Sequence, residues 1–382
     1  MKKTFKIVTV VSLIALASCS KDEPAQTPPT IETLKNVVFP ELQDVVVKKE
    51  FTSIAYPNPE KNGLAEQQII TTTQKSGVLS PLSPSFDTNT ELIYPGSILR
   101  GSSFLNARYD PLVLSNAFEK VKLSTTLKGA SNVVGDFYPT QSDIRTGINQ
   151  LVALQANNIN QQFIPAIFDY TSQDITTSES LVKSMNIHAN INASFALSVS
   201  AKFGYEKKET NTVDKHSVLI SFRQKLYSAS IDPKYYKDWI KGGINVAECG
   251  EYEPLYISNV DYGRTAYVLF ETNLSTQQLV SKVTASLSAS YGVVSGSAET
   301  QFNSEATSTF SQNSFKAYIY GGPLNGGLIT NLDGLRRFLT KPTPIELIGG
   351  SVPISYTVRR LRDNTEVDVR TVYKQETAAF PR

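Results

Sequence analysis

The sequence predicts an α+β protein in which long β-segments dominate. Two of its stretches, residues 185–205 and residues 279–310, place apolar and polar side chains on alternate positions. This is the period of a β-strand, whose side chains point to opposite faces in turn. A third stretch, residues 148–159 (INQLVALQANNI), has apolar residues at helical spacing. Strands and helices are therefore both expected, and the two alternating stretches are the most distinctive parts of the chain.

Residues 185–205 read MNIHANINASFALSVSAKFGY, with apolar or small residues on every odd position and polar or small residues on almost every even one. Strands of soluble proteins usually run about 5 to 6 residues. Transmembrane β-strands of about 9 to 11 residues show this alternation, apolar toward lipid and polar toward the lumen. The stretch is thus predicted to be a membrane-inserting β-hairpin. Its tip is either an odd-length loop near residues 192–198 or the polar segment 206–214.

Residues 279–310 show the same alternation, but the parity changes part of the way along. The apolar residues before the change are Val283, Ala285, Leu287, Ala289, Tyr291 and Val293, and those after it are Val294, Gly296, Ala298, Phe302, Ala306 and Phe310. Parity inverts across a hairpin loop of two or four residues. Gly292 and Gly296 lie where the change occurs and suit a turn. A second hairpin is predicted, although both stretches also fit long strands of a soluble β-sandwich or Ser-rich surface ribbons.

The N-terminus has the parts of a bacterial export signal. Three lysines precede a largely apolar run at residues 7–17, which is too short to cross a bilayer as a helix. Leu16-Ala17-Ser18-Cys19 resembles a lipobox, so residues 1–18 are predicted to be a lipoprotein signal peptide, Cys19 the acylated residue, and 19–44 a tether. The charged residues 20–23 resemble a signal for export to the outer membrane or cell surface, from which release is an open alternative. The alternative for residues 1–18 is an ordinary signal peptide that a cysteine follows by coincidence.

Charge and cysteine content exclude several classes of protein. The formal net charge is +2, and removal of residues 1–18 would leave 34 basic against 35 acidic residues. The chain has no excess of basic residues of the kind that would indicate a nucleic acid partner. Apart from Cys19, Cys249 is the only cysteine, so the mature chain is expected to have no internal disulfide.

Other segments have weaker signals. Residues 45–55 and 68–73 favour strands, residues 235–241 with Trp239 favour a short helix, and residues 354–373 alternate again. Residues 328–339 favour a helix that carries Arg336 and Arg337 near its C-terminal end, where cations suit the helix dipole.

Residues 256–268, YISNVDYGRTAYV, resemble a run characteristic of the cholesterol-dependent cytolysins, the thiol-activated pore-forming toxins. The specific core of this signature is Asn259, Val260, Tyr262, Gly263 and Arg264. The resemblance extends in the family's order over about residues 90–375. It includes Tyr94-Pro95-Gly96, residues 216–233, Ser314-Phe315, Gly321-Gly322 and residues 352–357.

The resemblance implies a cytolysin-like (MACPF/CDC) core over residues 45–382. That core is a twisted antiparallel central sheet flanked by two helical bundles, with an elongated β-rich lobe. The bundles would be residues 184–215 and 279–310, which the family keeps as helices in the soluble form and extends into a barrel. Gly321 and Gly322 would form a hinge, and Phe315 would help to pair strands between neighbouring subunits. Its expected aromatic partner on the preceding strand is not evident near residues 175–177.

One departure from the family concerns the C-terminus. The family ends in a β-sandwich with a Trp-rich loop that recognises sterol, whereas this chain is expected to lack that domain and has a single tryptophan, Trp239. It resembles the short cytolysin-like proteins that work beside a longer, membrane-recognising partner. That resemblance also implies trimming of a C-terminal extension by a protease.

No catalytic or metal-binding pattern is evident. The two histidines, His188 and His216, do not form a pair at metal-ligand spacing, and HExxH, GxSxG and phosphate-loop motifs do not occur. His188 is expected to be a polar residue facing the lumen. Cys249 is expected to pack as a small apolar residue, and Arg264 is expected either to be a buried ion-pair partner or to be functional. We therefore expect neither an enzyme nor a cofactor.

The predicted function is a pore formed by a homo-oligomer, or by a hetero-oligomer with a longer relative, that inserts two hairpins per subunit into a lipid bilayer. The alternative is a surface lipoprotein that binds a glycan or protein partner and never inserts. A hydrolase would need a convergent polar site. The predicted membrane-inserting residues are Ile187, Ile191, Phe195, Leu197, Val199, Val283, Leu287, Tyr291, Phe302 and Phe310.

Overall fold

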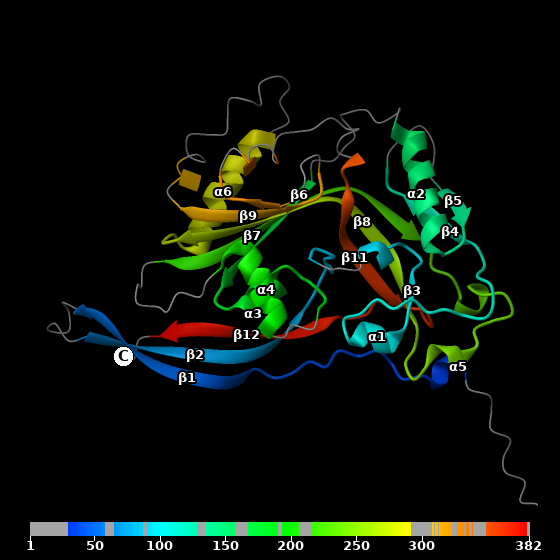
Figure 1. The fold of residues 1–382 in the computed structure, drawn as a ribbon, viewed down its shortest axis with the longest axis horizontal. Helices are drawn as coiled ribbons and strands as arrows, with labels where there is room; N and C mark the ends of the chain where they lie inside the picture. Colours follow the sequence, from blue (N-terminus) through cyan, green and yellow to red (C-terminus); the bar gives the residue numbers. More distant parts are fainter. Residues whose placement is uncertain are drawn as a thin grey trace, which may run out of the picture.

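The fold was determined as a computed structural model (Figure 1). It describes residues 30–57, 65–86, 90–127, 134–156, 167–189, 193–205, 215–291, 308, 310–311, 313–322, 327–331, 334–335, 338 and 349–379. The predicted signal peptide and Cys19 lie outside the described residues.

A large antiparallel sheet forms the centre of the molecule. Within the described residues its main path runs in the order β10-β9-β8-β7-β4-β5, while β6 pairs with β7, and β3 and β11 pair with β8. Its strands are β3 (Ile98–Leu99), β4 (Val121–Thr125), β5 (Val134–Phe137), β6 (Ile167–Ile175), β7 (His216–Ile231), β8 (Leu255–Thr272), β9 (Ser314–Tyr320), β10 (Gly327–Ile329) and β11 (Val352–Arg360). Strands β7 and β8 are rich in β-branched and aromatic residues, which favour strands.

A second, three-stranded sheet extends away from the first along the lower edge of Figure 1. It consists of β1 (Val45–Pro57), β2 (Ala65–Val78) and β12 (Arg370–Ala379), with β2 in the middle. Both pairings are antiparallel. This is the elongated β-rich lobe that the resemblance implied, and it confirms the strands predicted at residues 45–55 and 68–73.

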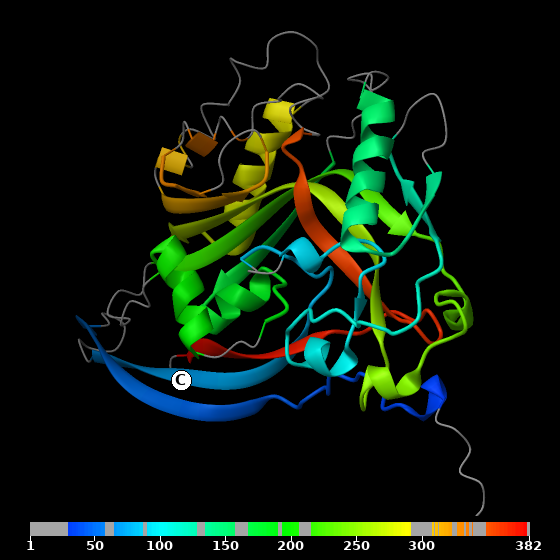
Figure 2. The ribbon, with the colours of Figure 1, turned by 45° about the vertical axis from the view of Figure 1, so that its right-hand side comes forward.

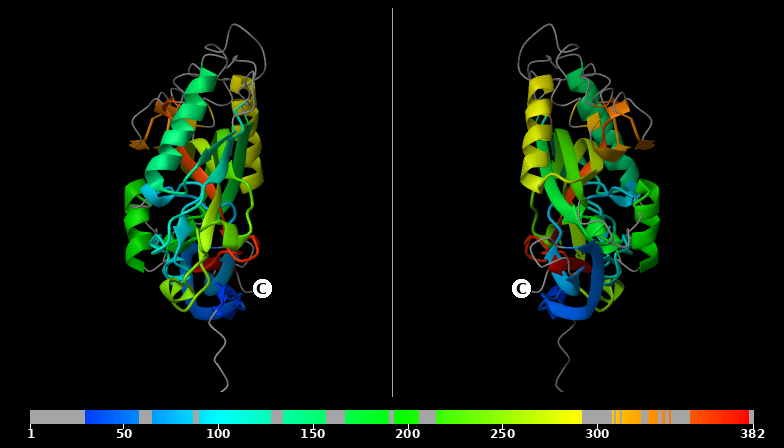
Figure 3. Two further views of the ribbon diagram at one scale, coloured as in Figure 1. Left: turned by 90° about the vertical axis from the view of Figure 1, so that its right-hand side faces the viewer. Right: turned by 90° about the vertical axis from the view of Figure 1, so that its left-hand side faces the viewer.

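Helices cover both faces of the large sheet. They are α1 (Gly101–Leu105), α2 (Gln141–Ala156), α3 (Ser178–Ser184), α4 (Ala193–Phe203), α5 (Val246–Cys249) and α6 (Thr276–Tyr291), with short 3₁₀ turns at Ile31–Thr33, Thr90–Leu92 and Tyr236–Asp238. Figure 3 shows α3 and α4 on one side of the sheet and α6 on the other. The predicted twisted antiparallel sheet with helices on either side is therefore confirmed.

Four clusters of buried apolar residues hold these layers together. One centres on Trp239 and packs α2 against β4, with Cys249 among its members. A second lies beneath α1 and β11. The other two lie on opposite faces of β7 and β8, one beneath α3 and α4 and one beneath α6. Cys249 is 3% exposed, as expected for a small apolar residue.

Three predicted elements differ in extent. The helix predicted at 148–159 is α2, which begins earlier, at Gln141. The helix predicted at 235–241 is only the 3₁₀ turn Tyr236–Asp238. The alternation of 354–373 belongs to two strands, β11 and β12, separated by residues 361–369.

The prediction of a helix at residues 328–339 was wrong for the first residues of this range. Residues 327–329 form β10, which pairs with Ala317–Ile319 of β9, and the described residues 334–335 and 338 are helical. An available strand edge supplies backbone partners to this segment, so tertiary context overrides its local preference. Arg336 and Arg337 lie outside the described residues.

A buried carboxylate anchors the N-terminal segment to this sheet. Glu253, whose side chain is fully buried, accepts hydrogen bonds from Arg360 Nε at 3.0 Å and from the backbone N–H of Val37 at 2.9 Å. Arg362 Nη2 lies 3.7 Å from its second oxygen. The backbone of Lys35 also pairs with residues 251 and 253.

Replacing Glu253 by Gln should lower the free energy of unfolding by about 3 kcal/mol, the lower end of the cost of breaking a buried ion pair. The lower end applies because Arg360 and Arg362 keep some solvent contact, with side chains 18% and 23% exposed. Urea denaturation measures the change. The matched control is Glu251→Gln, because Glu251 and Lys35, which form an ion pair, are both 62% exposed, and exposed ion pairs contribute little to stability. Equal effects of the two substitutions would contradict the assignment.

Candidate functional site

The first predicted hairpin segment connects β6 to β7, and the structure has two helices there, α3 and α4. Helix α3 begins with a capping box, in which the Thr177 side chain accepts from the N–H of Ser180 and the Ser180 hydroxyl accepts from the N–H of Thr177. Helix α4 buries Ala196, Val199 and Phe203. These residues contact the face of the sheet that carries Leu219, Tyr267 and Leu269. Figure 2 shows both helices between the large sheet and β12.

The second predicted hairpin segment connects β8 to β9 and begins with α6. Leu279 and Val283, one helical turn apart, are buried against the opposite face of the sheet, which carries Val218, Ile220 and Phe270. Phe310 packs in the same cluster, with its ring 5.3 Å from that of Phe270. The two segments therefore cover opposite faces of one four-stranded ribbon, β6-β7-β8-β9.

The alternation of both segments predicts strands, but this structure has helices there. The physical reason is that α4 also has apolar residues at helical spacing, at 196, 199 and 203, so a helix buries a continuous face. Leu197 is left 62% exposed on the outer side of the helix. The helical form that the resemblance implied for these segments agrees with α4 and α6.

The structure places the predicted inserting residues as follows. Ile187, Val199, Val283 and Phe310 are buried, and Phe195 is half-buried. Leu287 and Tyr291 belong to α6. Ile191 and Phe302 lie outside the described residues. The structure thus separates these residues onto two faces of the sheet and does not bring them together.

The family signature lies where the central sheet changes partners. Strand β8 pairs with β11 up to Gly263 and with β9 from Thr265 onward, while β7 pairs with it from Asn259 to Thr272. Gly263 permits this close packing, because a Cβ there would lie 2.0 Å from the carbonyl oxygen of Gln224. Asn259, Val260 and Tyr262 belong to the part of β8 that pairs with β11.

Arg264 is buried at the same point. Its Nε donates to Oε1 of Gln224, its Nη1 donates to the backbone oxygen of Phe338, and its guanidinium lies 4.7 Å from the centre of the Phe338 ring. Arg264 is therefore buried, as the first of the two expectations required, and the partners named here are uncharged. Arg264 joins Phe338 to β8 through the carbonyl and the ring of Phe338, and it joins β8 to β7 through the side-chain amide of Gln224.

The predicted hinge residues form the turn after β9. Gly321 and Gly322 have φ of +79° and +95°, a conformation that favours glycine. A Cβ on Gly321 would lie 2.8 Å from the oxygen of Gly263, and the N–H of Gly322 donates to the oxygen of Gly350. The two glycines therefore pack directly against the point where β8 changes partners.

Sequence reasoning did not identify Asp261, which joins three strands at this point. Its carboxylate accepts from Ser228 (2.6 Å) and Lys225 (2.9 Å) on β7, and from Ser355 (2.8 Å) on β11. Asn259 on β8 donates to it as well. Burial raises the pKa of this carboxyl, but the four hydrogen bonds outweigh burial and hold the pKa below its usual range. The sequence did contain a signal for this residue, since Asp261 is an acidic residue within a run of residues that favour a strand.

Both neighbours of β8 are irregular beside Asp261. The β7 pairing has a bulge between Lys225 and Tyr227, and the β11 pairing has one between Pro353 and Ser355. Bulges bend strands and increase their twist. The carboxylate of Asp261 therefore holds the sheet together where it is most distorted.

Two further predicted residues, His188 and Phe315, lie in apolar surroundings in this structure. His188 is buried, its Nε2 lies 2.8 Å from the oxygen of Phe104, and aromatic rings surround it. Phe315 packs against Phe270 and Phe310 of the same chain. On β6, Tyr170 is an aromatic residue that is 42% exposed.

The C-terminal strand is attached to the start of the first hairpin segment. Thr176 Oγ1 accepts from the N–H of Glu376 at 2.9 Å, and Thr177 Oγ1 donates to the oxygen of Lys374. Glu179 of α3 lies 3.6 Å from Lys374 Nζ. Strand β12 therefore holds α3 through its backbone.

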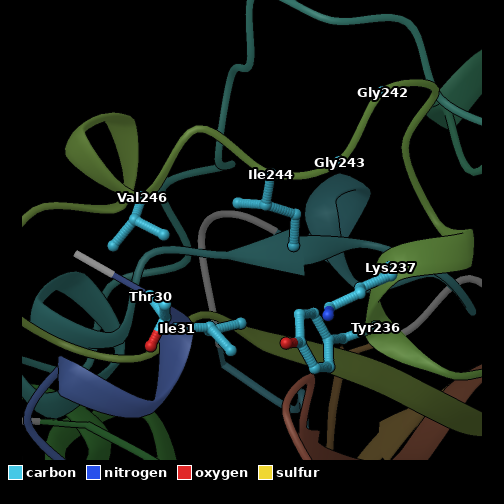
Figure 4. A pocket seen from close by; sticks show the side chains of 8 residues that line it. All are labelled: Thr30, Ile31, Tyr236, Lys237, Gly242, Gly243, Ile244 and Val246. Atoms are coloured by element: carbon cyan, nitrogen blue, oxygen red, sulfur yellow. The ribbon is translucent and has the colours of Figure 1, made fainter. Parts of the chain in front are cut away.

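Two hollows lie on the described surface. The hollow in Figure 4, of about 500 Å³, is lined by Thr30, Ile31, Tyr236, Lys237, Gly242, Gly243, Ile244 and Val246. Lys237 is its single charged lining residue. A second, of about 470 Å³, lies between β12 and the ends of β6 and β7. Among the described residues no three His, Cys, Asp or Glu side chains are grouped to hold a metal ion. The helices in the described part of the chain are all too short or too polar to cross a bilayer.

The fold is similar to that of solved toxin structures. The chain matches intermedilysin, described as a human-specific toxin, with a TM-score of 0.63 and 23% identity over 93% of this chain and 73% of that one. Suilysin from Streptococcus suis matches with a TM-score of 0.61 and 19% identity, over 93% and 74%. The architecture is therefore that of the cytolysin toxins.

Sequence comparison leads to the same class. The chain is 27% identical to seeligeriolysin of Listeria seeligeri over 72% of this chain and 52% of that protein, and 22% identical to streptolysin O of Streptococcus pyogenes over 76% and 51%. A family model described as thiol-activated cytolysin matches residues 47–378. The chain belongs to the thiol-activated cytolysin family, a family of cytolysins and not of enzymes. It spans about half the length of the curated relatives that it matches.

Replacing Asp261 by Asn should lower the free energy of unfolding at neutral pH by about 1.5 to 3 kcal/mol, the range for hydrogen bonds to a charged group. Because the pKa of Asp261 is lowered by folding, its stabilisation is fully present above the ordinary carboxyl pKa of about 3.9 and is lost as the pH falls through the folded-state pKa. Urea denaturation should show a constant difference from wild type between about pH 5 and 8, and a shrinking one below about pH 4.

The exposed Asp238 supplies the control for this substitution. Asp238→Asn should change the free energy of unfolding by less than about 0.5 kcal/mol, as surface substitutions usually do. A difference between Asp261→Asn and wild type that grows in acid would contradict the assignment.

Proposed function

We propose that this protein is a pore-forming cytolysin that assembles into a ring and extends two amphipathic β-hairpins per subunit into a transmembrane β-barrel. Membership of the thiol-activated cytolysin family supports this proposal. Ser, Thr and Asn side chains would line the water-filled side of the barrel, and the predicted inserting residues would face lipid. Closure is required because lipid offers no partner to an open strand edge.

One observation carries the proposal: each alternating segment connects two antiparallel strands that are already paired. Strand β6 pairs with β7 up to Ile175 and Ser217, and the first segment lies between those residues. Strand β8 pairs with β9 up to Glu271 and Ser314, and the second segment lies between them. Extending the segments would lengthen ladders that exist, so no new topology is needed.

The packing of α4 supports the proposal that the same residues can also form a β-strand. As a helix it buries residues 196, 199 and 203, but Leu197 is 62% exposed and Phe195 is half-buried. In a strand, residues 195, 197, 199 and 203 would share one face. The exposed leucine is unfavourable in the helix and favourable on a lipid-facing strand.

The edges of the ribbon supply the assembly surface. In the described part of the chain, β6 pairs with β7 and with no strand on its other side, while β9 is covered only along Ala317–Ile319 by the short β10. Unpaired strand edges readily pair with another chain. A subunit of the same kind or a longer relative would add at these edges, with Phe315 and Tyr170 as aromatic residues near them.

The turn at Gly321 and Gly322 would act as the hinge. Both glycines adopt positive φ and adjoin the change of partner in β8, and glycines can change φ at low cost. Straightening the sheet there would align β9 with the rest of the ribbon.

Release of the first segment would require loss of its attachment to β12. Trimming that removes β12 from Lys374 onward would take away the partners of Thr176, Thr177 and Glu179. We include such trimming by a protease in the proposal. We also include export as a lipoprotein acylated at Cys19 to the outer membrane or cell surface, from which the protein would act on a target membrane.

Replacing Leu287 by Arg should abolish pore formation, because an arginine at the bilayer midplane on the lipid face costs about 2 to 4 kcal/mol. Soluble expression should persist. The matched control is the adjacent Ser288→Arg, which would face the water-filled lumen and should retain most dye release. Release of dye from vesicles measures both. Equal dye release by the two variants would contradict the assignment of Leu287 to the lipid face and Ser288 to the lumen face.

The test of the function as a whole is leakage of dye-filled vesicles made from bacterial or host lipid. Purified residues 20–382 are added before and after limited proteolysis, alone and with a longer cytolysin relative. We expect release after trimming or with the partner. No release in any combination, with intact monomers by electron microscopy, would favour the alternative, a lipoprotein that binds a glycan or protein and never inserts.

A further inference from the structure

The first hairpin segment is attached to the body of the protein at residues 186–188, the junction that follows α3. The backbone N–H of Ser83 donates to the oxygen of Asn186 at 2.9 Å. The hydroxyl of Tyr109 donates to the backbone oxygen of His188 at 3.4 Å. The junction is therefore held by two loops that are remote from it in sequence.

The ring of His188 connects this junction to the apolar cluster beneath α1 and β11. Its centre lies 4.4 Å from that of Phe104, 5.5 Å from that of Phe39 and 6.1 Å from that of Tyr109. Phe104 and Tyr109 belong to the cluster, and Phe39 packs against it. These three rings form an aromatic cage, in which His188 is 5% exposed.

The hydrogen bond of His188 defines where its proton lies. Nε2 is 2.8 Å from the backbone oxygen of Phe104, which can only accept, so Nε2 carries the proton and donates it. A second proton would be added at Nδ1 and would place a full charge inside the aromatic cage. Burial opposes this charge more strongly than the bond to Phe104 favours it, and lowers the pKa of His188 from 6.5 to about 4.

No charged side chain among the described residues contributes to the pKa of His188. The titratable groups on the cage side are the hydroxyls of Tyr109 and Tyr356, which bond to each other. Charged residues of the elements packed around the ring have other partners or are exposed: Lys35 pairs with Glu251, Glu41 with Arg370, Glu179 with Lys374, Arg359 with Glu366 and Arg360 with Glu253, Lys183 lies over the ring of Tyr373, Arg100 donates to the oxygen of Glu248, and Arg108 and Asp110 are exposed.

We propose that His188 is an acid-released latch, in which protonation expels the ring from the aromatic cage and detaches the junction from the body of the protein. The inference concerns the soluble form and goes beyond the proposed function, because it names a condition that starts release of the first hairpin segment. Before α3, the segment is held by β12 through Thr176 and Thr177. The latch and β12 are thus two separate attachments, one on each side of α3.

Acid should weaken the latch. The pKa of His188 has its ordinary value of 6.5 when the junction is open and is about 4 when the junction is closed. The attachment is therefore fully stable above pH 6.5, weakens as the pH falls toward 4 and changes no further below that. With these values the equilibrium between the closed and open junction shifts by about 20-fold between pH 7 and pH 5.

The chain has only two histidines, so the titration of His188 can be measured by itself. His216 is exposed and lies 3.8 Å from Asp174. The variant His216→Gln leaves His188 as the single histidine, and NMR of histidine-labelled protein should show a pKa well below 6.5 for its ring. A pKa at or above 6.5 would overturn the proposal, since the cage would then stabilise the charged ring by cation–π contacts.

Hydrogen exchange followed by mass spectrometry measures release of the junction directly. The reporters are the N–H groups of Met185, Asn186 and Ala189, which donate to backbone oxygens. Their protection, corrected for the intrinsic effect of pH on exchange, should fall about 20-fold from pH 7 to pH 5 in wild type, while β8 keeps its protection. His188→Gln keeps a donor for Phe104 but cannot gain a proton, so its protection should change less than about twofold. The matched control His216→Gln should behave as wild type.

Two results of the exchange experiment would overturn the proposal. An equal loss of protection in wild type and His188→Gln would assign the acid response to another group. A loss in β8 at the same pH as in the junction would mean that acid unfolds the whole protein. If His188→Gln does not fold, the NMR titration still decides. Neither measurement involves a membrane, so a failure of the latch is distinguishable from a failure of the proposed pore-forming function.

Discussion

Strand β8 is the element on which the rest of the structure depends. It pairs with β7 along most of its length, with β11 and β3 over its first half, and with β9 over its second half. A strand can have only two neighbours at any level, so the change from β11 to β9 forces the sheet to fork at Gly263 and Arg264. The buried Arg264, the carboxylate of Asp261 and the close contact of Gly321 with Gly263 all occur at this fork. Arg264 and Asp261 thus lie where the pairings of β8 with β7 and β11 are irregular.

In the predicted hairpin segments, the apolar residues fit both the spacing of a helix and the spacing of a β-strand. A helix buries residues 196, 199 and 203 of α4 against the sheet, whereas a strand would gather all odd residues from 187 to 205. Val199 and Phe203 satisfy both periods, and Leu197 satisfies only the second. Burial against the sheet and the capping box of α3 stabilise the helical form in water. Water provides no apolar partner for a ribbon with one fully apolar face, and a bilayer does.

Particular residues show how far sequence reasoning reaches. The alternation identified both segments, and the signature around Tyr262 identified the family, because each is a local pattern. Asp261 was missed because its importance comes from Ser228 and Ser355, which are remote in sequence and adjacent only in the sheet. The rings of Phe39 and Phe104 that enclose His188 in this structure are likewise remote from it in sequence. The start of the helix expected at residue 328 became a strand because β9 offered it an edge.

The sequence by itself determined the α+β class, the two alternating segments and the cytolysin signature, since side-chain periodicity and short motifs are properties of neighbouring residues. The tertiary structure decided which strands those segments join, on which face each helix lies and in what register the four central strands pair. Register is a long-range property, set by hydrogen bonds between residues as far apart as Ile175 and Ser217 or Glu271 and Ser314. Only with that register do the apolar residues of two separate segments have defined neighbours, because a periodic pattern alone fits any pairing shifted by two residues.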